Sequence, residues 1–248
     1  MHPFFECAMM TFMDILYIII PAYNEEDNIR QVIEDWYPVV ERHNGGGASR
    51  LVLINDGSVD DTYKIICECA LTRPLLQPLT KENSGHGSTL LYGYRYALKA
   101  GADYIFQTDS DGQTLASEFE PFWEQRVSYD MLIGRRKHRA DGKGRVLVSR
   151  VLRLVLLLTF RVWIRDANCP YRLLRAQTLA SCIDLIPRNF ALSNVLMSVI
   201  YARRHFSVRS LPVTFRPRQG GMNSINARRI AAIGIRAVRD FRVLRKRL

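Results

Sequence analysis

The chain has 248 residues and a formal net charge of +11, with 48% apolar and 24% charged residues. This composition is that of a globular protein and excludes a disordered tail, a collagen-like chain and a disulfide scaffold. No apolar run reaches the roughly 20 residues of a spanning helix, which excludes a multi-pass membrane protein. The five cysteines are odd in number and lack zinc-site spacing, and residues 1–13 lack the pattern of a signal peptide. We therefore expect reduced thiols and a cytoplasmic location.

The charge is divided unequally between the two halves of the chain. Residues 1–124 hold 8 Lys and Arg against 19 Asp and Glu, a net charge of −11, and residues 125–248 hold 27 against 5, a net charge of +22. This division predicts an acidic half suited to a metal ion and a basic half suited to an anionic partner. Nucleic acid, an anionic membrane and a phosphorylated substrate are the candidate partners.

The first half alternates between predicted strands and helices. Short apolar runs predict strands at residues 15–20, 51–54, 75–79 and 104–107. Amphipathic or capped segments predict helices at residues 28–42, 60–74 and 87–100. This alternation predicts an α/β fold with a mostly parallel, Rossmann-like sheet and helices on both faces.

Three polar clusters follow predicted strands, at residues 21–25, 56–58 and 109–113. In a parallel sheet, ligands bind beyond the carboxyl ends of the strands, and these ends meet at one edge. We therefore expect the three clusters to converge in one crevice.

The third cluster carries a candidate metal site. Asp109 and Asp111 stand two residues apart after a strand, where a loop can turn both carboxylates to the same side. Oxygen ligands without His or Cys favour Mg²⁺ or Mn²⁺ over zinc, and Gln113 could add a third oxygen. Taken alone, such a stretch is more often a solvated turn, and a lone His86 is more often a surface residue than a catalytic base.

The second half is predicted to be less regular. Its predicted extended segments are residues 131–133, 171–175 and 207–215. Its predicted helices are residues 145–165, 192–203 and 225–248. No repeat, low-complexity region or long linker divides the chain into independent domains.

Two of these predicted helices, at residues 145–165 and 225–248, are basic and amphipathic. On a helical wheel, about 120° of arc in the first helix holds Arg150, Arg153, Arg161 and Arg165. The apolar residues on most of the remainder are Leu152, Val155, Leu156, Leu158, Val162 and Trp163. A basic face opposite an apolar face is typical of a helix that lies in the interface of an anionic bilayer. The alternative is that each apolar face packs on the rest of the chain or on a second subunit.

Motifs in both halves together carry a resemblance to a known family. The motifs of the first half are Pro21-Ala22-Tyr23-Asn24-Glu25, Asn55-Asp56-Gly57-Ser58, Asn83-x-Gly85-x-Gly87 and Asp109-x-Asp111-x-Gln113. In order and spacing they resemble family 2 glycosyltransferases of the GT-A fold. The motifs of the second half are Gly134-Arg135-Arg136, Arg145-x-x-x-Ser149-Arg150, Asp166-x-x-Cys169-Pro170-Tyr171-Arg172 and Pro212 with Arg218-x-Gly220-Gly221. These resemble the dolichyl- and polyprenyl-phosphate sugar synthases within that family.

The resemblance implies roles for individual residues. Those that would bind the nucleotide sugar are Pro21, Ala22, Tyr23, Glu25, Ile54, Asp56, Ser110 and Gln113. Those that would hold Mg²⁺ or Mn²⁺ are Asp109, Asp111 and Gln113. Because guanidinium groups pair with phosphate in a bidentate manner, the candidates for the acceptor phosphate are Arg136, Arg150 and Arg218. The expected catalytic set is Asp109, Asp111, Arg136 and Arg218, and Asp166 is expected to orient an arginine or the acceptor.

The resemblance also implies a domain organisation. A GT-A domain would cover residues 1–224, with a nucleotide-sugar-binding half at residues 15–125 and an acceptor half at residues 126–224. The amphipathic pattern adds a basic helix at residues 225–248 after this domain.

The function that we expect is metal-dependent, inverting transfer of a sugar from GDP-mannose or a UDP-sugar to a polyprenyl phosphate, dolichyl or undecaprenyl. Such an acceptor is already anionic, so it needs positioning by cations more than deprotonation by a base. The enzyme would lie on the cytoplasmic face of an anionic membrane, and a small integral-membrane protein is a candidate partner.

Two alternatives remain open at this stage. The first is a family 2 enzyme that elongates a saccharide or modifies a protein, and its hydroxyl acceptor would need a carboxylate base from the second half. The second is a nucleic-acid-binding protein without enzymatic activity. We expect no nucleic-acid partner, because the arginines accompany amphipathic helices rather than a basic face interleaved with aromatic residues.

Overall fold

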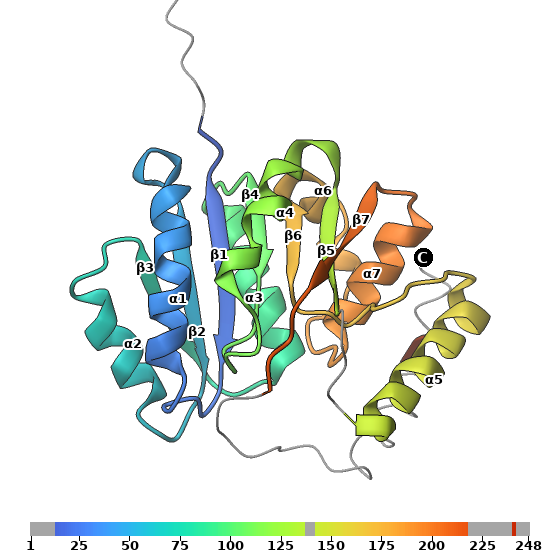
Figure 1. Ribbon diagram of the computed structural model, residues 1–248, viewed down its shortest axis with the longest axis horizontal. Coiled ribbons are helices and arrows are strands. Elements are labelled where there is room, and N and C mark those ends of the chain that lie inside the picture. The colour runs from blue at the N-terminus through green and yellow to red at the C-terminus, as the bar shows by residue number, and fades with distance from the viewer. Residues whose placement is uncertain (1–12, 137–141, 218–239, 242–248) are drawn as a thin grey trace, which may run out of the picture.

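The computed structural model describes residues 13–136, 142–217, 240 and 241, with residues 142–149 as backbone alone. Its strands form one mixed sheet in the order β3-β2-β1-β4-β6-β5-β7 (Figure 1). The strands are β1 (Leu16–Ala22), β2 (Arg50–Asp56), β3 (Leu76–Lys81), β4 (Tyr104–Gln107), β5 (Met131–Arg136), β6 (Arg172–Arg175) and β7 (Val208–Val213). The helices are α1 (Ile29–Arg42), α2 (Thr62–Ala70), α3 (His86–Lys99), α4 (Glu120–Glu124), α5 (Gly142–Phe160), α6 (Ala176–Ala180) and α7 (Ser193–Arg203).

The first half of the sheet is parallel, as its sequence predicts. β1 pairs in parallel with β2 on one side and with β4 on the other, and β2 pairs in parallel with β3. β1, β2 and β3 are each followed by a helix that returns the chain to the opposite end of the sheet, and β4 is followed by a loop at the carboxyl edge. The predicted α/β fold is confirmed.

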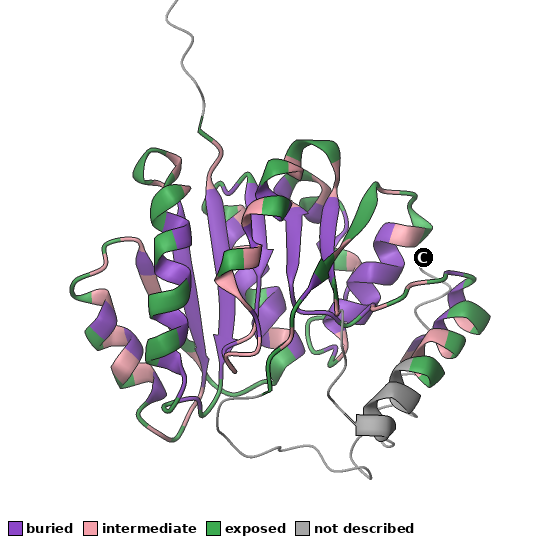
Figure 2. Ribbon diagram, viewed as in Figure 1, coloured by how far each residue is buried: buried purple, intermediate pink, exposed green. Residues whose placement is uncertain are grey.

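Helices cover both faces of the sheet because its central strands are apolar on both sides. Along β1, Leu16, Ile18 and Ile20 join the core cluster that contains α1 and α2. The intervening Tyr17 and Ile19 join the cluster that contains α3 and α7. This alternation follows from the two-residue period of a strand, and Figure 2 shows the central strands buried between the helices.

The second half of the sheet contains an antiparallel strand that the sequence did not reveal. β6 runs antiparallel to both β4 and β5, whereas β7 runs parallel to β5. Arg172, at the start of β6, is fully buried and donates hydrogen bonds to the carbonyl oxygens of Ala167, Cys169 and Asn194. These bonds fix β6 to the turn that precedes it and to the first turn of α7.

The predicted helix at residues 145–165 ends earlier than its apolar pattern does. α5 stops at Phe160, and Arg161 has a φ of 57°, a left-handed conformation that ends the helix. The prediction that Arg161, Val162, Trp163 and Arg165 share faces of this helix is therefore wrong. Of the predicted helix at residues 225–248, all but Asp240 and Phe241 lies outside the described residues.

Within the described part of the chain, no helix is both long enough and apolar enough to span a membrane.

Candidate functional site

The three predicted polar clusters lie at one edge of the sheet. β1, β2 and β4 are parallel neighbours, and the clusters at residues 21–25, 56–58 and 109–113 follow their carboxyl ends. The structure therefore brings these clusters to the same edge, as the sequence predicts.

The loop after β1 is held by the loop after β2. Asn24 has a φ of 53°, its backbone N–H donates to Ser58 Oγ at 3.0 Å, and its side-chain oxygen accepts from the backbone N–H of Val59. The backbone N–H of Glu25 donates to Thr62 Oγ1 at 2.8 Å, at the start of α2. The buried carboxylate of Glu25 accepts a hydrogen bond from Asn28, and Tyr23, two residues before Glu25, is 48% exposed. Pro21 and Ala22, the last residues of β1, are buried.

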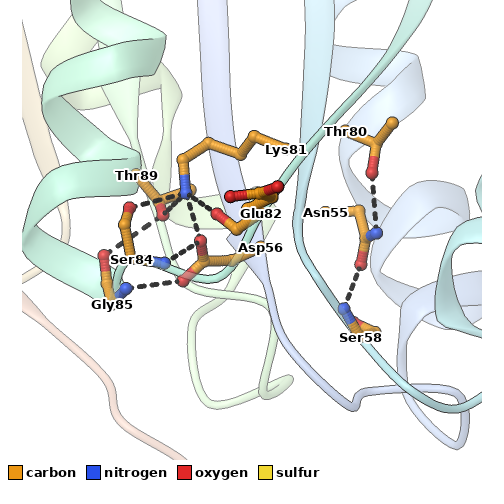
Figure 3. A network of polar contacts seen from close by, with 9 residues as sticks. All are labelled: Asn55, Asp56, Ser58, Thr80, Lys81, Glu82, Ser84, Gly85 and Thr89. Carbon is orange, nitrogen blue, oxygen red and sulfur yellow. Dashed lines mark hydrogen bonds and ion pairs between the residues drawn. The ribbon is translucent and has the colours of Figure 1, made fainter.

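Asp56 is the centre of a network that joins β2, β3 and α3 (Figure 3). The Lys81 ammonium donates to its carboxylate, and so do the backbone N–H groups of Ser84 and Gly85, both at 3.0 Å. Lys81 also donates to Ser84 Oγ at 2.6 Å. Asp56 is only 3% exposed, so these donors replace the water that its charge would otherwise need. The network fixes the turn that leads into α3.

The side chain of Ile54 lies in the core. A methyl group built at Gly93 of α3 would lie 2.6 Å from Ile54 Cδ1 and 2.5 Å from Ile19 Cγ2. α3 therefore approaches the sheet as closely as a glycine allows, and Ile54 supports that helix. The predicted contact of Ile54 with a nucleotide stays a prediction.

The loop after β4 presents the two aspartates. The hydroxyls of Thr108 and Thr114, which flank the loop, share a hydrogen bond of 2.6 Å. The backbone N–H of Gln113 donates to Asp111 Oδ1 at 3.2 Å, and Ser110 is buried between the aspartates in sequence. The loop is therefore closed at its base and braced by its own backbone.

Asp109 fits a cation. Its Oδ1 is buried and has no hydrogen-bond partner among the described residues, and His86 Nε2 lies 3.7 Å from it, beyond hydrogen-bond distance. The described residues contain no group of three or more His, Cys, Asp or Glu that could hold a metal. Mg²⁺ commonly takes one or two carboxylates together with phosphate oxygens and water, so the aspartate pair suits an ion that a phosphorylated ligand helps to hold.

Gln113 connects this loop to the segment after β7. Its Nε2 donates to the carbonyl oxygen of Arg216 at 2.9 Å, and the backbone N–H of Arg216 donates to the Gln113 carbonyl at 2.8 Å. Two residues earlier, the Thr214 backbone N–H and hydroxyl both donate to the carboxylate of Glu118, each at 2.8 Å. This contact between residues 113–118 and residues 214–216 was not predicted, because nothing in either sequence indicates its partner.

Arg136 is held where β5 ends. Its Nε and Nη2 donate to Asp166 Oδ2 and Oδ1 at 3.0 and 3.1 Å, a bidentate pair, and its guanidinium carbon lies 4.9 Å from the centre of the Phe215 ring. Arg150 is exposed on α5, and no hydrogen bond or ion pair between described residues joins it to Arg136. Arg218, the third predicted phosphate-binding arginine, lies outside the described residues.

The apolar residues of α5 divide between the core and the surface. Leu156 and Phe160 are buried, and the Phe160 ring packs edge-on against Phe241 at 5.4 Å. The exposed apolar residues of α5, with the tryptophan that follows it, are Val151, Leu154, Leu157, Leu158 and Trp163. Arg153 links the helix to the returning chain, since its Nη2 donates to the Arg165 carbonyl at 2.9 Å and its guanidinium carbon lies 5.2 Å from the Trp163 ring centre. One side of α5 thus packs on the chain, as the alternative reading expected, and another side is exposed. That the exposed side contacts a membrane stays a prediction.

Comparisons with known proteins agree with this arrangement. The model of the family described as "Glycosyl transferase family 2" matches residues 17–193. The undecaprenyl-phosphate 4-deoxy-4-formamido-L-arabinose transferase of Pectobacterium atrosepticum is 24% identical over 201 residues, which cover 76% of this chain and 60% of that protein. The polyprenol monophosphomannose synthase of Mycolicibacterium smegmatis is 24% identical over 225 residues, covering 86% and 82%. The chain thus spans about three fifths of the length of the first of these relatives.

Solved structures share the fold. The glucosyl-3-phosphoglycerate synthase of Mycobacterium tuberculosis, in complex with Mn²⁺, uridine diphosphate and glucosyl-3-phosphoglycerate, superposes with a TM-score of 0.65. It is 16% identical, and the match covers 94% of this chain and 80% of that one. The likeness confirms the predicted GT-A type of sheet.

Proposed function

The chain belongs to glycosyl transferase family 2, and we propose that it transfers a sugar from a nucleotide sugar to a polyprenyl phosphate. The observation that carries the proposal is Asp109 Oδ1, a buried carboxylate oxygen without a hydrogen-bond partner among the described residues, at the edge where the ends of β1, β2 and β4 meet. The names of the two relatives, each a transferase or synthase acting with a polyprenyl carrier, support the acceptor class.

Asp109 and Asp111 are the proposed ligands of Mg²⁺ or Mn²⁺. Such an ion, when bound with the donor, supplies a Lewis acid that offsets the charge on the departing nucleoside diphosphate. Gln113 Nε2 donates a hydrogen bond to the Arg216 carbonyl oxygen, so Gln113 Oε1 is the proposed third protein ligand of the metal ion. Ser110, buried in the same loop, would face the donor phosphates through its backbone or hydroxyl.

The loops after β1 and β2 are the proposed nucleoside site. Pro21 and Ala22 would form its floor, and the exposed ring of Tyr23 offers a surface on which a base can stack. Glu25 and Asp56, both buried and hydrogen-bonded, supply carboxylate oxygens that can accept from a base or ribose. GDP-mannose and UDP-sugars both satisfy these residues.

The proposed nucleophile is a phosphate oxygen of the lipid. This oxygen forms a bond to the anomeric carbon as the bond from that carbon to the donor diphosphate breaks, so the sugar inverts and the nucleoside diphosphate leaves. Arg136, Arg150 and Arg218 are the proposed cations that hold the acceptor phosphate. An anionic acceptor needs no strong base, because it has already lost its proton.

The carboxylates of the basic half support an anionic acceptor over a hydroxyl acceptor. Asp166 pairs with Arg136, and the exposed Asp184 pairs with Arg95 at 3.1 Å. Although burial alone would raise the pKa of Asp130, hydrogen bonds from Thr178 and Ser207 lower it below its usual value. These three aspartates are engaged in contacts that do not suit a general base for a sugar hydroxyl.

The outward side of α5 is the proposed contact with the membrane. Its exposed leucines and valine, with Trp163, would enter the interface, while Arg150 and Arg153 would face anionic headgroups. A polyprenyl chain cannot leave the bilayer without exposing its hydrocarbon to water, so the enzyme has to approach the lipid. We place this contact on the cytoplasmic leaflet, and a small integral-membrane protein could assist it.

The direct test uses the purified full chain with Mn²⁺ and anionic vesicles that contain undecaprenyl or dolichyl phosphate. Radiolabelled GDP-mannose, UDP-glucose and UDP-N-acetylglucosamine are supplied in turn, and label is counted in the organic phase. We expect label from one donor to enter that phase only when the lipid phosphate is present. Label that appears instead in a water-soluble saccharide or in protein would favour the hydroxyl-acceptor alternative and overturn the proposal.

A further inference from the structure

We infer that Asp166 is a positioning residue that fixes the direction of the Arg136 guanidinium toward the acceptor phosphate. The inference rests on the proposed function, because that proposal assigns Arg136 to the acceptor. It assigns Asp166 a role in orientation, distinct from that of a general base or a merely structural carboxylate.

The pair has the geometry that orientation requires. Two parallel N–H···O bonds of 3.0 and 3.1 Å hold the plane of the guanidinium, which a single bond would leave free to rotate. The side chains of Arg136 and Asp166 are 16% and 7% exposed, so solvent competes little for either partner. The Phe215 ring, 4.9 Å from the guanidinium carbon, adds a further constraint. Because one edge of the Arg136 guanidinium and its plane are both fixed, the directions of its remaining N–H groups are fixed too.

The surrounding contacts tie this direction to the aspartate loop. Phe215 is followed by Arg216, whose backbone exchanges two hydrogen bonds with Gln113. Gln113 in turn donates its backbone N–H to Asp111. A short series of contacts therefore connects Arg136 to the loop that is proposed to hold the donor phosphates. These contacts would keep a constant distance between the acceptor phosphate and the donor phosphates.

The pair also closes the base of the segment that carries α5. Arg136 is the last residue of β5, and Asp166 follows α5 and the chain that returns from it. The two residues are 30 positions apart in sequence. The stretch of chain from Arg136 to Asp166, which contains α5, thus begins and ends at this ion pair.

Orientation and affinity should respond to loss of Asp166 in opposite ways. A carboxylate beside Arg136 offsets its positive charge and weakens its attraction for phosphate, so removal of that charge should not weaken phosphate binding. The same change releases the guanidinium, and a misplacement of about 1 Å from the reacting groups costs on the order of 100-fold in rate. A merely structural carboxylate would show neither this split nor its dependence on Arg136.

The test compares Asp166→Asn, Arg136→Lys and the double variant with the wild type. Asp184→Asn is the matched control, because Asp184 is another aspartate of the basic half that pairs with an arginine, Arg95, but it is 88% exposed. Transfer is measured with polyprenyl phosphate, and binding of geranyl phosphate, a water-soluble short-chain analogue, is measured by calorimetry. Thermal unfolding is recorded for every variant.

For Asp166→Asn we expect kcat to fall roughly 10- to 100-fold, with geranyl phosphate bound as tightly as by the wild type or more tightly. Arg136→Lys should weaken that binding, and the double variant should be no slower than Arg136→Lys alone, because Asp166 acts through Arg136. Weaker geranyl phosphate binding by Asp166→Asn, or a fall of kcat in the double variant equal to the product of the two single fold-changes, would overturn the inference. Binding is independent of turnover, so a wild type that binds geranyl phosphate but transfers no sugar would overturn the proposed function alone.

Discussion

Lys81 donates a hydrogen bond to Asp56 from the directly opposite position on the neighbouring parallel strand. Asp56 is the last residue of β2 and Lys81 is the last residue of β3, so the pair joins the carboxyl ends of these two strands. Because Asp56 also accepts from Ser84 and Gly85, the same carboxylate sets the start of α3. A single charge pair therefore shapes both the proposed nucleoside site and the helix beside it.

Replacement of Lys81 should destabilise the fold. Lys81→Met removes the cation and leaves the Asp56 carboxylate buried, and loss of one partner of a buried pair costs about 3 kcal/mol of unfolding free energy. Urea denaturation monitored by circular dichroism measures this difference. Lys64→Met is the control, since Lys64 pairs with Asp61 at 3.5 Å on the surface and should change the unfolding free energy by less than about 0.5 kcal/mol. Equal stabilities of the two variants would contradict the central role of Asp56.

Asp109→Asn should abolish metal-dependent binding of the donor and leave the fold intact. The Asp109 Oδ1 has no described hydrogen bond to lose, so its thermal unfolding should match that of the wild type. Loss of a metal ligand should lower transfer by at least about 100-fold, since metal-ion catalysis is worth several kcal/mol. Calorimetric titration of UDP and GDP with and without Mn²⁺ measures binding. EDTA should reproduce the defect in the wild type, and added Mn²⁺ should reverse it there; a variant with near-normal turnover would refute the metal assignment.

Charges on the outer side of α5 should release the protein from membranes. Leu154→Asp combined with Leu158→Asp places two carboxylates where exposed leucines would enter the interface, and should lower vesicle binding at least about tenfold. Leu71→Asp is the control, because Leu71 is 87% exposed after α2 and away from α5 in sequence. Flotation with anionic vesicles at low and high salt measures binding, and salt should weaken that of the wild type. Equal flotation of the double variant and the control would show that another surface makes the contact.

Cys169 should resist alkylation while the protein is folded. Burial raises the pKa of its thiol to about 12, and the nearby Asp166 charge adds to that effect. An unfolded thiol ionises near pH 8.5, so at pH 9 iodoacetamide should modify the half-buried Cys67 and spare Cys169. Mass spectrometry of tryptic peptides measures both. Modification of the two thiols at the same rate would contradict the burial of Cys169.

The raised pKa of the Cys169 thiol also determines how the stability of the fold changes with pH. The folded state holds the Cys169 proton more tightly than the unfolded state does, so the associated stability is fully present below about pH 8.5. It is lost as the pH rises toward about 12, the folded-state pKa. The unfolding free energy in urea should therefore fall between pH 8.5 and 11, and by less in a Cys169→Ala variant.

The parallel half of the fold could be predicted because its signals are local. A run such as residues 51–54 is apolar throughout, as a strand buried on both faces must be, and polar residues follow it at once. The rule that strand ends meet at one edge then brings Asp56 and Asp109 to the same edge without further information.

Features that depend on distant partners could not be predicted. The pattern of polar and apolar residues at positions 172–175 does not distinguish an antiparallel strand from a parallel one. The direction of β6 is set by its pairing with β4 and β5. The apolar pattern of α5 continues to Trp163, but the chain turns at Arg161. Lys81 was missed because a lone lysine after a short strand carries no signal until its partner across the sheet is known.

β6 completes the centre of the sheet, although it follows both of its neighbours in the chain. During synthesis β4 therefore leaves the ribosome with one edge able to pair with β1 and the other edge open until residues 172–175 have emerged. An open edge with apolar side chains such as Ile105 and Phe106 is a template for pairing with another nascent chain. A pause in translation between β4 and β6 would prolong the exposure of this edge and should increase the need for chaperones.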